Sequence, residues 1–137
     1  MITNNIRRNK MILKIIVKGK AKGKILKSKK PINFLGAVDK KTGIIHDSSH
    51  EMFQKSVKDA ILAFPHGIGS SVGAYTIYSL KSNGSAPAAM ICTKSDLSVA
   101  SGCALANIPL VIASQEEFDS LLNDKEVTLD AESGQIL

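Results

Sequence analysis

Short apolar runs separated by turn-forming residues define the predicted strands of this chain. They are rich in aliphatic residues and too short for helices, which favours strands. The last of them, residues 125–137, holds two alternating apolar segments around Glu-Ser-Gly and predicts a closing hairpin. The other predicted strands lie at residues 11–19, around 24–28, within 57–65 (where Pro65 ends the strand), and in the buried runs 86–94 and 108–114.

Residues 71–81 have the periodicity of an amphipathic helix. Asn83 and Gly84 follow it and are typical of the end of a helix. The apolar positions predicted to share one side of this helix are Val72, Tyr75, Ile77 and Leu80.

Two further helices are predicted from their capping residues. Residues 95–107 form a second helix with Ser95 or Asp96 as its N-cap. Residues 114–122 form a third, in which Ser114 and Glu117 have capping-box spacing.

The order of these elements indicates the fold class. Residues 33–47 are predicted as loop, turn and strand, with Asp39–Gly43 reversing the chain. Strands dominate both ends, and strands alternate with helices between them. The pattern predicts a mixed α/β domain with a small curved or barrel-like β core and flanking helices. We expect residues 11–137 to form this single domain, with residues 1–10 as a loose basic leader.

Composition narrows the class of protein. The chain has 137 residues, of which 44% are hydrophobic and 22% charged, as in soluble globular proteins. No apolar run approaches the ~20 residues of a membrane span, and Lys14 and Lys18 interrupt the first apolar stretch, which argues against a signal peptide. Two cysteines are too few for a disulfide scaffold, so we expect a cytoplasmic protein.

The net charge of +6 is unevenly distributed. Residues 1–38 carry eleven Lys or Arg and no acidic residue, whereas residues 39–137 carry seven basic and twelve acidic ones. Lys18, Lys20, Lys22 and Lys24 alternate, as on the solvated face of a strand, and on an edge they would also discourage pairing. Because no aromatic residue precedes Phe34 to stack on bases, we favour the solvated face over a partner-binding patch or nucleic-acid binding.

The most distinctive stretch is FPHGIGSSVGAY, residues 64–75. Residues 69–73 match the G-x-S-x-G pattern of a nucleophile elbow. That hydrolase order needs a histidine after the serine, but all three histidines lie before it. Its glycine spacing also differs from a dinucleotide fingerprint, and no Gly-Lys-Ser/Thr follows to make a P-loop.

The potential metal ligands do not form a recognisable set. His46 and His50 stand four residues apart, Cys92 and Cys103 eleven apart, and no C-x-x-C occurs. We interpret them as a surface histidine pair and two core thiols, so we expect this chain to bind no metal.

Two interpretations of the serine loop remain open at this point. Gly67 and Gly69 allow close backbone approach, and the amides of residues 70–73 would open a helix, where an anion fits. Alternatively, Ser70 simply caps the helix. Any catalytic use of the serine needs a cation from elsewhere; because no arginine follows Arg8, a partner is the natural source.

Three stretches together resemble the small subunits of the aconitase X family. They are NFLGAVDKKTGIIHDSSH, AILAFPHGIGSSVGAY, and the spacing from there to SAPAAMI and ALANIPLV. The resemblance covers about residues 11–137 and implies a swivelling β/β/α domain that works with a separate large catalytic subunit, in a heterodimer or a larger assembly. It implies a 4Fe–4S cluster in that partner and no cofactor on this chain.

The resemblance also implies an activity and a site. Archaeal members dehydrate a phosphorylated hydroxy acid, (R)-5-phosphomevalonate, to trans-anhydromevalonate 5-phosphate in an alternative mevalonate route. The family's proton-abstracting serine falls on Ser70, with Gly69 and Ser71 as substrate-binding neighbours. Neither nucleic acid nor a membrane is implied.

Some features leave alternatives. His66 stands where a small residue is expected, and it either contacts substrate phosphate or faces solvent. Other family members act on another hydroxy acid, cis-3-hydroxy-L-proline. Outside the family, a swivelling carrier would use His66 for phosphotransfer, and a basic adaptor would use the lysine-rich N-terminal third.

Overall fold

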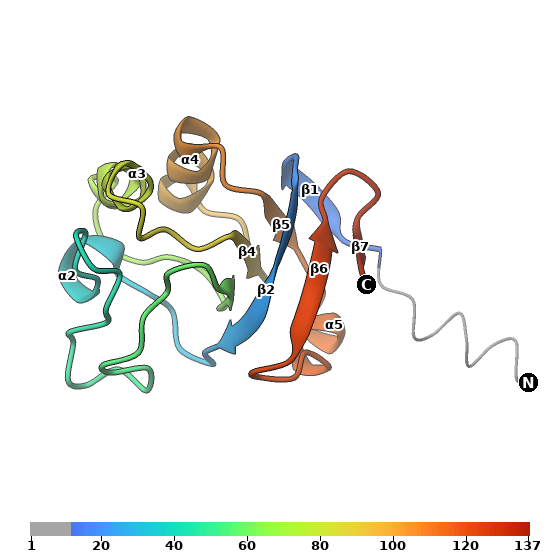
Figure 1. Ribbon diagram of the computed structural model, residues 1–137, viewed down its shortest axis with the longest axis horizontal. Helices are drawn as coiled ribbons and strands as arrows, with labels where there is room; N and C mark the ends of the chain where they lie inside the picture. The colour runs from blue at the N-terminus through green and yellow to red at the C-terminus, as the bar shows by residue number, and fades with distance from the viewer. Residues whose placement is uncertain (1–11) are drawn as a thin grey trace, which may run out of the picture.

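The computed structural model describes residues 12–137, and the predicted leader at residues 1–10 lies outside them. Seven strands form one sheet in the order β1-β5-β4-β3-β2-β6-β7, with helices on both of its faces (Figure 1). The elements are β1 Lys14–Val17, β2 Lys20–Lys27, α2 Phe34–Ala37, β3 Ile61–Ala63, α3 Gly73–Ser82, β4 Ala89–Cys92, α4 Leu97–Ala106, β5 Leu110–Ile112, α5 Gln115–Asp119, β6 Glu126–Asp130 and β7 Gln135–Ile136. The mixed α/β class and the curved sheet with flanking helices are confirmed.

The direction of the strands divides the sheet into a parallel centre and antiparallel margins. β2, β3, β4 and β5 run parallel to one another, whereas β1 pairs antiparallel with β5. β6 joins β2 antiparallel, and β7 closes the predicted hairpin on β6. The parallel centre brings the carboxyl ends of β2, β3 and β4 to one edge, where ligand sites of such sheets lie.

Alternating side chains of the central strands build two cores on opposite faces of the sheet. Leu62 and Met90 belong to the core that also contains Ile77 of α3 and Cys103 of α4. Their neighbours along the strands, including Ile61 and Ile91, belong to the core that Phe118 of α5 completes. The helices α3 and α4 therefore cover the face of the sheet opposite to α5.

Helix ends follow the predicted capping chemistry. The Asp96 carboxylate accepts the N–H of Val99 at 3.1 Å and caps α4. Ser114 and Glu117 form the complete capping box of α5. At the end of α3, Asn83 is the C-cap and Gly84 has a φ of 71°.

The lysine row lies on one face of the sheet. Lys18, Lys20, Lys22 and Lys24 are exposed, which confirms the predicted alternation. β2 pairs with β6 along Lys20–Lys24 but with β3 only along Ile25–Lys27, so a role of these lysines in discouraging further pairing stays a prediction. Lys20 and Lys24 stand opposite Asp130 and Glu126 of β6, and Lys20 reaches the Asp130 carboxylate at 3.8 Å, so acidic groups lie among the lysines.

Residues 33–47 differ from the predicted loop, turn and strand. They begin with the short helix α2, because the Asn33 side chain accepts the N–H of Gly36 and caps it. The Asp39–Gly43 reversal is confirmed: the Asp39 carboxylate accepts the N–H of Lys41 at 2.8 Å, and this hydrogen bond lowers the pKa of Asp39. The expected strand is reduced to isolated bridges at Ile44 and Ile45.

The predicted apolar side of α3 is partly wrong. Ile77 and Leu80 are buried, but Val72 is 44% and Tyr75 68% exposed. Small residues take the inner positions instead, because α3 packs very closely on α4. A Cβ at Gly102 of α4 would lie 2.9 Å from the Cβ of Ile77.

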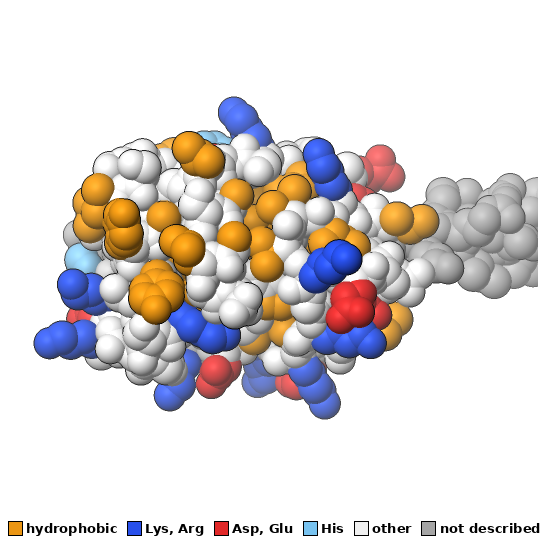
Figure 2. Space-filling view, turned by 90° about the horizontal axis from the view of Figure 1, so that it is seen from above, with side chains coloured by type: hydrophobic (Ala, Val, Ile, Leu, Met, Phe, Trp, Pro, Cys, Tyr) orange, Lys and Arg blue, Asp and Glu red, His pale blue; other side chains and the backbone are white. Residues whose placement is uncertain are grey.

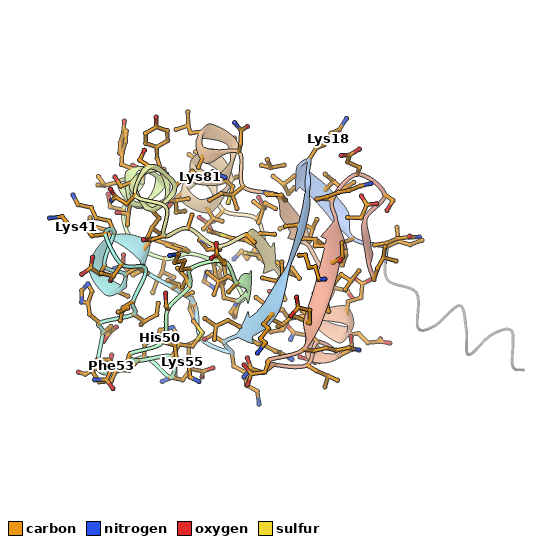
Figure 3. All side chains as sticks on the ribbon, in the orientation of Figure 1. Lys18, Lys41, His50, Phe53, Lys55 and Lys81 are labelled. Carbon is orange, nitrogen blue, oxygen red and sulfur yellow. The ribbon has the colours of Figure 1, made fainter. Side chains whose placement is uncertain are left out.

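His50 is buried, so the predicted surface histidine pair is wrong for this member; His46 is exposed. Figure 3 labels His50 among the side chains. Its ring connects two loops: the N–H of Met52 donates to Nδ1 at 3.1 Å, and Nε2 lies 3.1 Å from the carbonyl oxygen of Pro31. Because Nδ1 accepts, Nε2 carries the proton and donates to Pro31. His50 is therefore a structural residue.

We expect His50→Ala to lower the free energy of unfolding by about 1–3 kcal/mol, because it leaves an N–H and a carbonyl oxygen without partners. His46→Ala is the matched control, with an expected change within about 0.5 kcal/mol because its side chain is exposed. Urea unfolding of both variants measures the difference. Equal stability of the two variants would contradict the bridging role of His50.

Candidate functional site

The glycine- and serine-rich segment Pro65–Val72, here called the serine loop, joins β3 to α3. It leaves the sheet at the carboxyl edge of the parallel strands, between the segments that follow β2 and β4. Hydrogen bonds to both of these neighbouring segments fix its path.

On the β4 side, the serine loop is tied at its start and at Gly67. The Pro65 carbonyl oxygen accepts the N–H of Thr93 at 3.0 Å and that of Lys94 at 3.2 Å. The Gly67 N–H donates to Oδ2 of Asp96 at 2.8 Å. Since Asp96 also caps α4 through Oδ1, one carboxylate fixes both the loop and the start of that helix.

On the β2 side, Ile32 and Asn33 hold the centre of the loop. The Ile68 N–H donates to the Ile32 carbonyl oxygen at 3.0 Å, and the Ile32 N–H donates to that of His66 at 3.2 Å. Gly69 has a φ of 96°, and a Cβ there would lie 2.9 Å from Oδ1 of Asn33. The conformation therefore favours glycine at this position, and a Cβ would also require the Asn33 side chain to shift.

Ser70 is exposed, and its hydroxyl oxygen already accepts one hydrogen bond. The Val72 N–H donates to Ser70 Oγ at 3.1 Å, and the Gly73 N–H donates to the Ser70 carbonyl oxygen at 3.0 Å. The prediction that Ser70 caps the helix is wrong: the N-cap of α3 is Val72, with no side-chain cap hydrogen bond, and Ser70 instead closes the turn before the helix. The same N–H would stabilise negative charge on Oγ, because a donor to the charged form favours that form.

The anion cradle is smaller than expected. Of the four amides at residues 70–73, those of Val72 and Gly73 are taken by Ser70 itself. Within residues 12–137, the amides of Ser70 and Ser71 meet no protein acceptor. Ser71 is also exposed, and its carbonyl oxygen accepts the N–H of Ala74 at 3.0 Å. The two free amides and the two hydroxyls are what this loop offers to a ligand.

His66 is half-buried beside the loop. Its Nδ1 lies 2.8 Å from the carbonyl oxygen of Gly67 and donates to it, because a carbonyl oxygen only accepts. This bond turns the ring toward its own backbone and leaves Nε2 as the nitrogen open to other contacts.

The cysteines do not fit a cluster or metal site on this chain. Cys92 and Cys103 are buried in the α3–α4 core, and burial raises the pKa of Cys103 to about 12 and that of Cys92 well above its usual value. Metal ligation requires the thiolate, which this environment disfavours. Among residues 12–137, no three His, Cys, Asp or Glu side chains form a group that could hold a metal ion.

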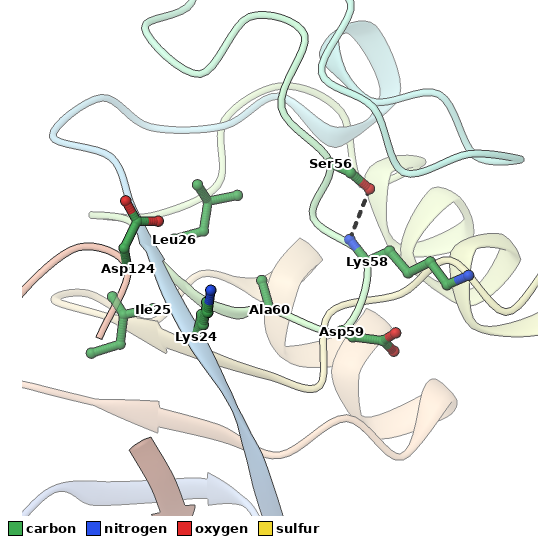
Figure 4. A pocket seen from close by; sticks show the side chains of 8 residues that line it. All are labelled: Lys24, Ile25, Leu26, Ser56, Lys58, Asp59, Ala60 and Asp124. Atoms are coloured by element: carbon green, nitrogen blue, oxygen red, sulfur yellow. Dashed lines mark hydrogen bonds between the residues drawn. The ribbon is translucent and has the colours of Figure 1, made fainter. Parts of the chain in front are cut away.

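Two cavities within the described residues lie away from the serine loop. The larger has a volume of about 290 Å³ and is lined by residues of β2, by Asp124 and by the segment Ser56–Ala60 before β3 (Figure 4). The smaller, of about 80 Å³, lies by α5 and β7. The serine loop follows β3 in the chain, whereas the segment Ser56–Ala60, which lines the larger cavity, comes before β3. The loop and the cavity therefore lie at opposite ends of that strand.

The comparison with known families identifies the fold family. The model of the aconitase X swivel domain matches residues 10–137. This chain belongs to that family. Its structure is similar to the crystal structure of Thermococcus kodakaraensis aconitase X in the holo-form, with a TM-score of 0.88 and 40% identity, over 93% of this chain and 95% of that one.

Two curated relatives extend the comparison. The chain is 43% identical over 122 residues to the phosphomevalonate dehydratase small subunit of Methanosarcina acetivorans, covering 88% of this chain and 85% of the relative. It is 42% identical over 121 residues to the protein of the same name from Thermococcus gammatolerans, covering 88% and 91%. In the part of the chain that the structure describes, no helix is long and apolar enough to cross a membrane.

Sequence reasoning missed the two residues that position the loop. Asp96 was predicted as a helix cap, but its bond to Gly67 spans 29 residues and has no local signal. Asn33 stands even farther from Gly69 in the sequence. Only the pairing of β2, β3 and β4 brings these segments together.

Gly69→Ala should destabilise the protein more than Gly84→Ala. Both glycines have positive φ, but a Cβ at Gly84 meets nothing within 4 Å, so this control isolates the backbone cost of about 1–2 kcal/mol. The contact with Asn33 adds to that cost at Gly69. Urea unfolding measures both variants, and a smaller loss for Gly69→Ala would contradict the described fit.

Asp96→Ala should accelerate amide hydrogen exchange at Gly67 as well as at Val99, because both N–H groups lose their acceptor. Ser114→Ala removes the cap of α5 at a similar cost of about 1 kcal/mol and is the control. Exchange measured by NMR should be unchanged at Gly67 in the control. An unchanged Gly67 rate in Asp96→Ala would show that this carboxylate does not hold the loop.

Proposed function

We propose that this chain is the small subunit of a cytoplasmic phosphomevalonate dehydratase and that Ser70 is its proton-abstracting base. The reaction would convert (R)-5-phosphomevalonate to trans-anhydromevalonate 5-phosphate. The names of relatives that are 42–43% identical over 88% of this chain support the activity. The observation that carries the residue assignment is the exposed Ser70 hydroxyl, in a loop that is hydrogen-bonded to both neighbouring segments and has a backbone N–H directed at its oxygen.

The chemistry asked of this chain is the removal of a proton. Dehydration takes a proton from the carbon next to the substrate carboxylate and a hydroxyl group from the adjacent carbon, and it forms a double bond between them. Ser70 Oγ would take the proton, and the Val72 N–H would stabilise the oxygen while it is ionised. The free amides of Ser70 and Ser71 would hold an anionic group of the substrate.

The rest of the site would come from a larger partner. A small subunit implies a large one, and in this proposal the iron–sulfur cluster belongs to that large subunit, since Cys92 and Cys103 do not fit a cluster on this chain. A serine hydroxyl is a weak base in water, so exclusion of solvent and cations from the partner are needed at Oγ. Residues 67–80 supply no charged side chain of their own.

Ser70→Ala should lower the turnover of the assembled two-subunit enzyme by about 10²–10⁴-fold or more, because the general base is lost. Ser71→Ala should have a milder effect, because it removes only a hydroxyl beside the base. Conversion of phosphomevalonate is measured by mass spectrometry, after size-exclusion chromatography has shown that each variant still assembles. Near-normal turnover of an assembled Ser70→Ala enzyme would eliminate Ser70 as the base.

A further inference from the structure

The outward sides of α3 and α4, together with the end of the serine loop, are free of charged side chains along most of their length. No Asp, Glu, Lys or Arg occurs in residues 67–80 or 97–115, in a chain of which 22% of the residues are charged. Figure 2, which shows the side of the molecule on which these helices lie, has hydrophobic side chains over them and charged side chains mainly around its margin.

Large apolar side chains project from this surface into solvent. They come from all three segments, and we call them the α3–α4 face: Ile68, Val72, Tyr75, Tyr78, Leu97 and Leu105, which are 44–77% exposed. Tyr75 and Leu97 are the most exposed of the six, at 68% and 77%. Several large exposed apolar side chains gathered on one uncharged side of a molecule are typical of an interaction site.

The helices are close enough for these side chains to act as one surface. A Cβ at Gly73 would lie 3.0 Å from Ser98 Oγ, near the beginning of both helices, and Gly102 is packed equally closely on Ile77. The two helices follow parallel strands and start side by side. Leu97 therefore lies next to the serine loop, to which its neighbour Asp96 is bonded at 2.8 Å.

The composition of α4 indicates that its outer side is covered in the working protein. Its inner side buries Val99 and Cys103, yet its outer side carries Leu97, Ala104 and Leu105 in exposed positions. A helix that faces water is expected to be polar on that side, and a helix that is apolar all round is normally buried. Within the described residues, no segment of this chain covers it.

We infer that the α3–α4 face is the surface on which the large subunit docks. This inference rests on the proposed function, which requires a partner to close over Ser70. The face is continuous with the serine loop, so a chain that shields Ser70 from water contacts Val72 and Leu97 first. Because the face is uncharged, the complementary surface of the large subunit is apolar. Tyr75 and Leu97 of this chain are the central anchors of the contact, a role in which aromatic residues are common.

The test is the affinity of this chain for the large subunit of the same organism, produced with its cofactor. Tyr75→Asp and Leu97→Asp each place a carboxylate in the first turn of a helix, where it is favourable for the helix, so the variants should fold. Each should weaken binding about tenfold or more in calorimetric titration. Leu122→Asp is the matched control, because Leu122 is 61% exposed but lies outside the face, and its affinity should be unchanged.

Wild-type affinity of the folded Tyr75→Asp and Leu97→Asp variants would overturn the inference, as would failure of the wild-type chains to associate. A face occupied by a second copy of this chain, which the large subunit does not displace in sedimentation experiments, would also overturn it. The proposed function fails separately: a wild-type complex that assembles through this face but does not convert phosphomevalonate refutes the function and leaves the docking surface in place.

Discussion

The tie between Asp96 and Gly67 is the interaction on which the geometry of the site depends. One carboxylate accepts an N–H from the serine loop at 2.8 Å and an N–H from the first turn of α4 at 3.1 Å. A carboxylate bonds backbone N–H groups more strongly than a neutral acceptor does. Two loops that leave neighbouring parallel strands are thereby held in one arrangement, and the glycines at 67 and 69 let the chain pass through the narrow space between them.

The parts of the fold that depend on local chemistry could be predicted from the sequence. The caps of α4 and α5, the stop of α3 at Asn83 and the turn at Asp39 each arise from residues a few positions apart. The order of the elements predicted the curved β core with flanking helices, and the family resemblance added the swivelling β/β/α type and pointed to Ser70. The short helix α2 was missed, because the cap at Asn33 is followed by a helix too short to show periodicity.

Errors occurred where tertiary contacts decide the outcome. Tyr75 fits the periodicity of α3, but α4 approaches closely at Gly102, and the buried positions of α3 are taken by smaller residues together with Ile77 and Leu80. His46 is exposed, but His50, four residues later, is buried, because its ring hydrogen-bonds to the carbonyl oxygen of Pro31 and the amide of Met52. In the site, the pairing of β2 with β3 brings Asn33 to Gly69, and no local pattern indicates that contact.

The exposure of Ser70 and the apolar character of its surroundings have a common explanation. A hydroxyl in contact with water gains nothing from a single N–H donor, since water supplies as many donors; the donor matters once solvent is removed. Removing solvent requires a second surface, and the apolar side chains of α3 and α4 beside Ser70 favour contact with one, because their burial is stabilising. In the proposed assembly, the exposed leucines of α4 would become buried against the partner, and the same contact would exclude water from Ser70.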